Sequence, residues 1–198
     1  MFFYLQPTLT IASELLGKHL VRNIGGVRLV AKIVETEAYM GESDLASHAR
    51  FGHTKRTDTM YLEGGRAYIY LIYGMYHCLN IVTQSAGAPE AVLIRAAEPI
   101  KGHEMLWHNR YPNHSYDESD AKGTINLTNG PGKLCQALAI TTALNGIDLN
   151  SRELSIEQGY AGKFGITAAT RVGIPYAGEY QHKLWRYFIT DNPYVSRK

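Results

Sequence analysis

The stretch Val34-Glu35-Thr36-Glu37-Ala38-Tyr39 is the end of a predicted β-strand whose two faces differ in chemistry. Successive side chains on a strand point to opposite sides. Glu35, Glu37 and Tyr39 therefore share one face, and the small or apolar side chains between them share the other. A carboxylate beside an aromatic ring can hold a flat ligand and activate a water molecule next to it. The alternative interpretation is a half-buried edge strand whose acidic side chains lie in solvent.

The segments around this strand predict a hairpin that is preceded by a helix and followed by a long loop. Strands at 19–21 and 27–39 are joined at Gly25-Gly26, which is a typical hairpin turn. Residues 10–17 predict a short helix with Thr10 as its N-cap and a glycine at its end. Residues 41–65 are polar and lack a sustained period, so we expect a long loop with at most short helical turns. A loop of that length within a compact domain is usually functional or disordered.

Three further strands, at 67–73, 78–83 and 91–97, form a predicted meander, and Pro99 is expected to end the last of them. A helix should follow to about Trp107. The next predicted elements are a polar surface excursion at 108–129, a helix at 130–138 with proline near its first turn, and a tail of short strands and turns at 166–189.

The predicted strands outnumber the helices and do not alternate with them, which favours a mixed α/β (α+β) fold. We expect one compact domain over residues 1–198, with a curved, mainly antiparallel sheet, surrounding helices and a protruding β-hairpin. A chain of this length can bury a sizeable core. No internal repeat, low-complexity tract or dividing linker interrupts it.

Composition excludes several classes of protein. The net charge of +2 is too small to indicate nucleic-acid binding by itself, so attraction to an anion would need a local patch. No signal peptide or run of about 18 apolar residues is present, which favours a cytoplasmic protein without a membrane span. Cys78 and Cys135 lie far apart between apolar neighbours and are expected to be buried thiols. The 14 tyrosines suit either stacking on planar ligands or an ordinary β-rich core.

The predicted turn at Tyr73-Gly74-Met75-Tyr76 carries unusually large apolar groups where polar turn residues are expected. Either the tip folds back onto the core, or it projects as a wedge that can enter and unstack a base step. The loop from His48 to Arg56 is locally basic, and basic side chains beside an aromatic wedge suit backbone contact combined with intercalation. Taken alone, a basic loop is usually just solvated.

Seven blocks in this order carry a resemblance that extends from about residue 12 to residue 196. They are Glu35–Tyr39, Asp44–His48, Tyr70–Tyr76, Asn80, Val92–Ala96 with Glu98-Pro99, Gly130–Leu138, and Arg171-Val172-Gly173. With them the sequence resembles the alkyladenine (3-methyladenine) DNA glycosylase family. The segment 101–128 matches the family poorly.

The resemblance implies roles for several of the matched positions. Glu37 corresponds to the general base, and Arg95 helps to hold the attacking water together with the backbone carbonyl of Val172. The residues that sandwich or edge the extruded base correspond to Tyr39, His48 and Tyr70, and Asn80 corresponds to the residue that disfavours normal guanine. Tyr73 corresponds to the side chain that fills the gap in the duplex, with Met75 and Tyr76 beside it at the intercalating tip.

The activity that this resemblance implies is base-excision repair. The enzyme would flip an alkylated or deaminated purine out of double-stranded DNA from the minor groove and hydrolyse its N-glycosidic bond. The substrates would be of the 3-methyladenine, 7-methylguanine, hypoxanthine and ethenoadenine type. No cofactor, metal or membrane is expected, and the implied protein is a monomer associated with the nucleoid. We expect a monofunctional hydrolase that leaves an abasic site without lyase activity, although Lys55 and Lys133 are the nearest candidates for a Schiff base.

Two other functions remain open. A non-catalytic binder of damaged DNA would keep the pocket and lose the chemistry, but the presence of Glu37 argues against this. A hydrolase of free modified nucleosides would share the carboxylate and the stacking tyrosines. The Tyr73–Tyr76 tip argues against that function, because a free nucleoside needs no wedge. A catalytic metal is not expected, since no Cys, Asp or Glu at ligand spacing accompanies His48 and His53.

Overall fold

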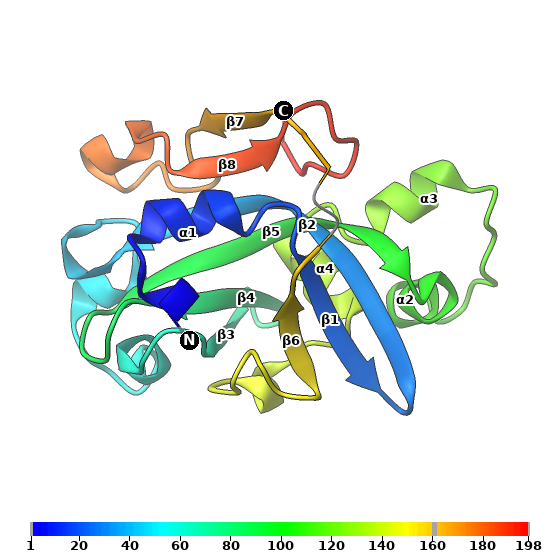
Figure 1. Cartoon of the computed structure of the whole chain (residues 1–198), viewed down its shortest axis with the longest axis horizontal. Helices are drawn as coiled ribbons and strands as arrows, with labels where there is room; N and C mark the ends of the chain where they lie inside the picture. Colours follow the sequence, from blue (N-terminus) through cyan, green and yellow to red (C-terminus); the bar gives the residue numbers. More distant parts are fainter. Residues whose placement is uncertain (1, 160–161, 198) are drawn as a thin grey trace.

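The strands pair antiparallel throughout a single curled sheet (Figure 1). The computed structural model describes residues 2–159 and 162–197. Within them the main path of the sheet runs β3-β4-β5-β2-β1-β6, and β8 pairs with both β2 and β7. The strands are β1 (His19–Ile24), β2 (Val27–Met40), β3 (Ala67–Ile72), β4 (Tyr76–Thr83), β5 (Glu90–Lys101), β6 (Leu154–Glu157), β7 (Ile166–Ala169) and β8 (Arg186–Ile189).

Short helices surround this sheet, so the predicted mixed α/β fold with a curved antiparallel sheet is confirmed. The α-helices are α1 (Thr8–Glu14), α2 (His103–Arg110), α3 (Ala121–Asn126) and α4 (Pro131–Ala137). Single 3-10 turns are η1 (Phe2–Leu5), η2 (Gly41–Ser43), η3 (His48–Phe51), η4 (Asp58–Tyr61), η5 (Thr142–Leu144) and η6 (Gly178–His182). No helix among the described residues has the length and apolar character needed to cross a membrane.

Strand β2 lies at the centre of the sheet, which excludes an edge position for its acidic residues. It pairs with β5 along most of its length, and on its other side with β1 over 27–32 and then with β8 over 35–37. The β2–β5 register shifts on both sides of Glu35, and such irregularities bend a strand and re-aim its side chains. Both Glu35 and Glu37 are consequently buried within the fold.

The hairpin, the meander and the long loop agree with the sequence. The β1–β2 turn contains Gly25 and Gly26, both with positive φ. Strands β3, β4 and β5 are neighbours in chain order. The loop from 41 to 65 contains only the turns η2, η3 and η4. Helix α4 has Pro131 in its first turn, and Cys78 and Cys135 are buried free thiols.

Two local predictions were wrong. Strand β5 continues past Pro99 to Lys101 because β4 pairs only with its first four residues, so the missing N–H of the proline falls where β5 pairs with β2 alone. Helix α1 begins at Thr8 with Pro7 as its N-cap, and Thr10 lies inside it. The Pro7 carbonyl accepts the first helical bond from the N–H of Ile11. Strand β6 was not predicted; it pairs with β1.

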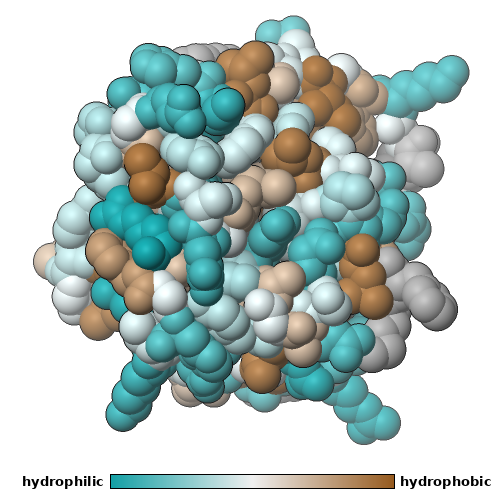
Figure 2. Space-filling model, turned by 90° about the vertical axis from the view of Figure 1, so that its left-hand side faces the viewer, coloured by the Kyte–Doolittle hydropathy of each residue, from teal (hydrophilic) through white to brown (hydrophobic). Residues whose placement is uncertain are grey.

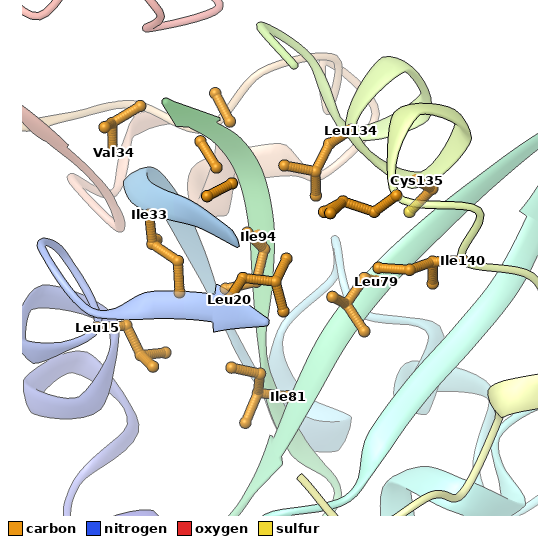
Figure 3. Packing of buried hydrophobic residues seen from close by; sticks show 14 of the residues in the cluster. Leu15, Leu20, Ile33, Val34, Leu79, Ile81, Ile94, Leu134, Cys135 and Ile140 are labelled. Carbon is orange, nitrogen blue, oxygen red and sulfur yellow. The ribbon is translucent and has the colours of Figure 1, made fainter. Parts of the chain in front are cut away.

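The core fills the interior of the curl and is covered by helices on different sides. Helix α1 contacts β2 and β5, and the side-chain hydroxyl of Thr36 donates to the backbone of α1 at Ala12. Helix α4 packs on β4 and β5. Figure 3 shows Leu134 and Cys135 of α4 directed toward Leu79 of β4. Helices α1 and α4 thereby hold the strands of the sheet in place around the buried polar residues of β2.

Candidate active site

A cavity of about 440 Å³ opens where β2, β3, β4 and β5 meet the 41–65 loop, the start of α4 and the segment 172–176. Its size is in the range of sites that hold small molecules. The sequence predicts a role in catalysis, base contact or gap filling for eight residues. Five of them line the aromatic part of this cavity: Tyr39, His48, Tyr70, Tyr73 and Asn80. Arg95 and Val172 line its floor, and Glu37 lies directly behind them, shielded from solvent.

Three contacts hold the Glu37 carboxylate. Oε1 accepts the backbone N–H of Val172 at 2.7 Å and lies 3.4 Å from Nη1 of Arg95, and Oε2 accepts the hydroxyl of Tyr39 at 2.9 Å. All three partners line the cavity. A carboxylate has about four lone-pair positions, so Oε2 keeps capacity for a further donor such as a water molecule.

Burial dominates the protonation chemistry of Glu37. It raises the pKa of this carboxyl above its ordinary value, while Arg95, the Val172 N–H and the Tyr39 hydroxyl act in the opposite direction. Burial also raises the pKa of the Tyr39 phenol, together with the neighbouring Glu37 charge. The phenol therefore stays protonated and serves as a donor to the carboxylate.

A second carboxylate, Glu35, holds the far side of Arg95. Its Oε1 lies 3.4 Å from Nε of Arg95 and 2.8 Å from Nη1 of Arg186, and its Oε2 accepts the backbone N–H of Ser196 at 2.7 Å. The hydroxyl of Ser196 accepts from Nε and Nη2 of Arg95 at 3.3 and 3.2 Å. Arg186 also donates to the carbonyl of Arg197. The C-terminal segment thus closes a buried ionic network beneath the cavity.

Another buried ion pair fixes the wall that contains Tyr39. Nη2 of Arg171 lies 2.8 Å from Oδ1 of Asp44, and Nη1 contacts the other carboxylate oxygen and donates to the Ala38 carbonyl. The guanidinium lies between the rings of Tyr39 and Trp185, at 4.8 and 5.0 Å from their centroids. Arg171 thus stacks on aromatic rings and also binds the Asp44 carboxylate with two nitrogens. It therefore fixes both the Tyr39 ring and the chain that leads into Val172.

Aromatic rings form the opposite wall. His48 and Tyr70 meet edge to face with ring centroids 4.5 Å apart, and Tyr68 lies 5.4 Å from Tyr70. Nδ1 of His48 is 3.0 Å from the Tyr68 hydroxyl. Burial, reinforced by the charges of Arg56 and Arg50, lowers the pKa of His48 to about 4. His48 is therefore neutral near pH 7 and offers a ring edge without a charge.

Asn80 lies on β4 with its side chain buried and its amide nitrogen donating to the Tyr68 carbonyl at 3.1 Å. This bond fixes the side-chain orientation. The Asn80 amide oxygen takes no part in this hydrogen bond. His53, for which the sequence predicts no role, stacks on Tyr61 and pairs with Asp58 at 2.8 Å. Among the described residues no group of His, Cys, Asp and Glu could hold a metal ion.

The β3–β4 turn projects from the cavity instead of folding back onto the core. Tyr73 is 83% exposed and Met75 66% exposed, whereas Tyr76 is partly covered because its ring lies against Gly132 of α4. Tyr73 has a φ of 53°, and Gly74 follows at 69°. A bulky residue in the left-handed region is strained, so the turn places a tyrosine where glycine or asparagine would be less costly.

Several residues of the site escaped the sequence analysis. Ser196 and Arg186 carry no motif, and nothing in one sequence connects position 35 with position 196. Arg171 belongs to a matched block but had no assigned role. Tyr176 lines the cavity from the 172–176 segment; its only sequence signal is an aromatic residue next to Pro175 in a turn-rich tail.

The comparisons with known proteins agree with this geometry. The family model for methylpurine-DNA glycosylase (MPG) matches residues 2–193. The chain belongs to the methylpurine-DNA glycosylase family. The resemblance inferred from the sequence blocks is therefore confirmed.

Relatives from three organisms are similar over nearly their full lengths. A protein of Clostridium perfringens is 49% identical over 200 residues, covering 99% of this chain and 97% of the relative. One from Methanocella arvoryzae is 48% identical over 197 residues, covering 99% and 94%. One from Natranaerobius thermophilus is 45% identical over 197 residues, covering 98% and 96%. Each is named as a candidate 3-methyladenine DNA glycosylase.

Proposed function

We propose that this protein is a DNA glycosylase that excises alkylated or deaminated purines from double-stranded DNA. The observation that carries this proposal is the buried Glu37 carboxylate, held by three residues that line an aromatic cavity. Membership of the methylpurine-DNA glycosylase family supports the same substrate class. Lesions of the 3-methyladenine, 7-methylguanine, hypoxanthine and ethenoadenine type would occupy the cavity.

Reaching a base inside a duplex requires its extrusion, at a cost of a few kcal/mol. Stacking on aromatic rings returns roughly 1–3 kcal/mol per base, and Tyr39, Tyr70 and His48 offer such surfaces on two walls. The projecting Tyr73 would enter the stack from the minor groove and fill the gap that the extruded base leaves. A free nucleoside has no stack to fill, and the exposure of Tyr73 and Met75 thus favours a duplex substrate.

Glu37 would act on the water that attacks the sugar. Breaking the N-glycosidic bond gives the sugar oxocarbenium character, as in glycoside hydrolysis. Ionised Glu37 would accept a proton from the water through Oε2 and stabilise the developing positive charge, while Arg95 and the backbone carbonyl of Val172 would help to position that water. Asn80, fixed by the Tyr68 carbonyl, would crowd the 2-amino group of normal guanine.

The decisive experiment compares Glu37→Gln with the natural protein in single-turnover excision from duplexes that each hold one lesion. Loss of the general base should slow excision about 10²–10⁴-fold, while affinity for lesion DNA is retained. The matched control is Glu118→Gln, because Glu118 is an exposed carboxylate in the polar 108–129 segment. Near-normal excision by the Glu37→Gln variant would exclude Glu37 as the base. No excision of any lesion by the natural protein would favour an inert binder.

We propose further that excision leaves an abasic site without strand cleavage. Lys133 is the lysine to test, because it lines the cavity and burial lowers its pKa. Its Nζ donates to side-chain oxygens of Asn126 and Asn129 at 3.1 and 2.8 Å, which supports a structural role. Borohydride trapping during turnover should give no covalent adduct. A stoichiometric adduct that disappears in Lys133→Arg would identify a lyase.

A further inference from the structure

A second group of exposed aromatic side chains lies at the cavity rim, on segments other than the β3–β4 turn. Phe51 at the end of η3 is 70% exposed, and Tyr176 in the 172–176 segment is 59% exposed. The guanidinium of Arg50 lies between them, 4.5 Å from the centroid of Phe51 and 5.0 Å from that of Tyr176. We call these three residues the rim cluster.

The rim cluster is continuous with the cavity. Tyr176 lines it directly, and so do Ser47 and His48, which lie just before Ala49 and Arg50 in η3 and its N-cap. Figure 1 shows the 41–65 loop in cyan and the segment around η6 in orange on the same side of the molecule. On that side, which faces the viewer in Figure 2, hydrophobic residues form separate patches among hydrophilic ones.

The side chains of the rim cluster contact one another. A hydrogen bond from Arg50 to the Leu45 carbonyl fixes the guanidinium, which supports both rings by cation–π contact. Exposed aromatic rings held in place in this way lose little side-chain entropy when a planar ligand stacks on them. Large apolar groups gathered at the edge of a cavity typically mark a binding surface.

The positive charge of Arg50 indicates which kind of ligand the rim cluster would bind. Among the described residues Arg50 has no carboxylate within ion-pair distance. Three acidic residues of the same loop are engaged elsewhere: Asp44 with Arg171, Asp58 with His53, and Glu42 with the Tyr61 hydroxyl. A cation between two exposed rings is complementary to a ligand that is both anionic and planar. A nucleotide of a DNA strand has these properties.

We propose that Arg50, Phe51 and Tyr176 form a stacking platform for an unstacked nucleotide that neighbours the extruded one in DNA. This inference rests on the proposed function and deepens it. The platform and Tyr73 would contact the DNA from two walls of the cavity, so that the strand is held on both sides of the point where the base leaves the helix. The platform acts in binding and does not touch Glu37.

The test uses a duplex with a tetrahydrofuran abasic analogue, which is bound without being cleaved. Phe51→Ala, Tyr176→Ala and the double variant are compared by fluorescence anisotropy. Removing one base–aromatic stack should weaken binding about 5- to 150-fold. The matched control is Ile100→Ala, an exposed apolar residue at the end of β5, which should leave affinity unchanged. Binding within twofold of the natural protein for the double variant would overturn the platform.

A second measurement locates the contact. 2-Aminopurine is placed singly at each of the three positions on either side of the analogue, because its fluorescence reports unstacking. We expect a fluorescence change at one or two positions with the natural protein, and its loss with the double variant. Retention of every change in the double variant would show that the rim cluster holds no nucleotide.

Excision separates the two proposals. Single-turnover excision by the natural protein, measured alongside these binding experiments, tests the proposed function by itself. Failure of the natural protein to excise any lesion would refute the proposed function while leaving the binding results interpretable. Natural excision combined with unchanged binding in the double variant would refute only the platform.

Discussion

Glu35 and Glu37 lie two residues apart on β2 and are equally shielded from solvent, yet their surroundings differ. Both oxygens of Glu35 are used by Arg95, Arg186 and the backbone of Ser196. Glu37 has one arginine at 3.4 Å and two neutral donors, and its partners border the cavity. Each carboxylate accepts three contacts, two on Oε1 and one on Oε2, but Glu35 faces two arginines and Glu37 faces one. Two arginines suit a charge that supports the fold, and partners that border a cavity suit a group that exchanges a proton. We therefore propose that Glu35 supports the fold and that Glu37 carries the chemistry.

The largest expected effect on stability is that of Glu35→Gln. Breaking a buried ion pair by removing one partner typically costs about 3–5 kcal/mol, because the other charge stays buried. Here two arginines lose a carboxylate, so we expect a loss of that size in the free energy of unfolding, measured with urea near pH 7. Glu118→Gln again serves as the surface control. A loss below about 1 kcal/mol would contradict the structural role of Glu35.

Glu37→Gln should behave in the opposite way because burial raises the pKa of Glu37. A carboxyl whose pKa is higher in the folded than in the unfolded protein contributes its stability below the unfolded value of about 4.3. That contribution is lost as the pH rises through the raised folded value. The Gln variant avoids this loss, so its stability relative to the natural protein should increase as the pH rises. Urea unfolding at several pH values measures the difference.

The same shift predicts the pH dependence of excision. Only ionised Glu37 can accept a proton, so the single-turnover rate should fall on the acid side at a pH above the ordinary carboxyl range. His48 should not contribute a limb near pH 6.5, because its pKa lies at about 4. His48→Gln should therefore keep the position of the acid limb even if its rate is lower. A limb that moves with this substitution would assign the titration to His48.

The sequence predicted those parts of the molecule that depend on local patterns. Alternation along β2 placed Glu35, Glu37 and Tyr39 on one side, and Gly25-Gly26 gave the hairpin. Contacts between residues far apart in the sequence could not be predicted from such patterns. The contact of Ser196 with Glu35 joins positions 161 residues apart, and no periodicity encodes such a distance. The prediction that Pro99 ends its strand was wrong because a strand with one unpaired side tolerates proline.

Ser196→Ala should sharpen the comparison by acting on Arg95 without touching either carboxylate. The substitution removes the acceptor for Nε and Nη2 of Arg95 and keeps the backbone N–H that binds Glu35. Loss of a hydrogen bond is worth about 1 kcal/mol, so we expect roughly a fivefold slower excision with unchanged DNA affinity. The acid limb should move to higher pH as Arg95 becomes less well fixed beside Glu37. Ser85→Ala, at an exposed position, is the control.

The smallest expected effect concerns the β3–β4 turn, where the relevant energy is backbone strain and not an ion pair. Tyr73 has a φ of 53°, a conformation that costs a non-glycine residue on the order of 1 kcal/mol. Tyr73→Gly should therefore raise the free energy of unfolding by about that amount, while binding to a well-paired lesion weakens more than binding to a mismatched one. Leu71→Ala, exposed on the same hairpin, should produce neither change. If Tyr73→Gly lost stability, the strained turn would owe its tyrosine to packing, and equal losses of binding on paired and mismatched lesions would remove the wedge.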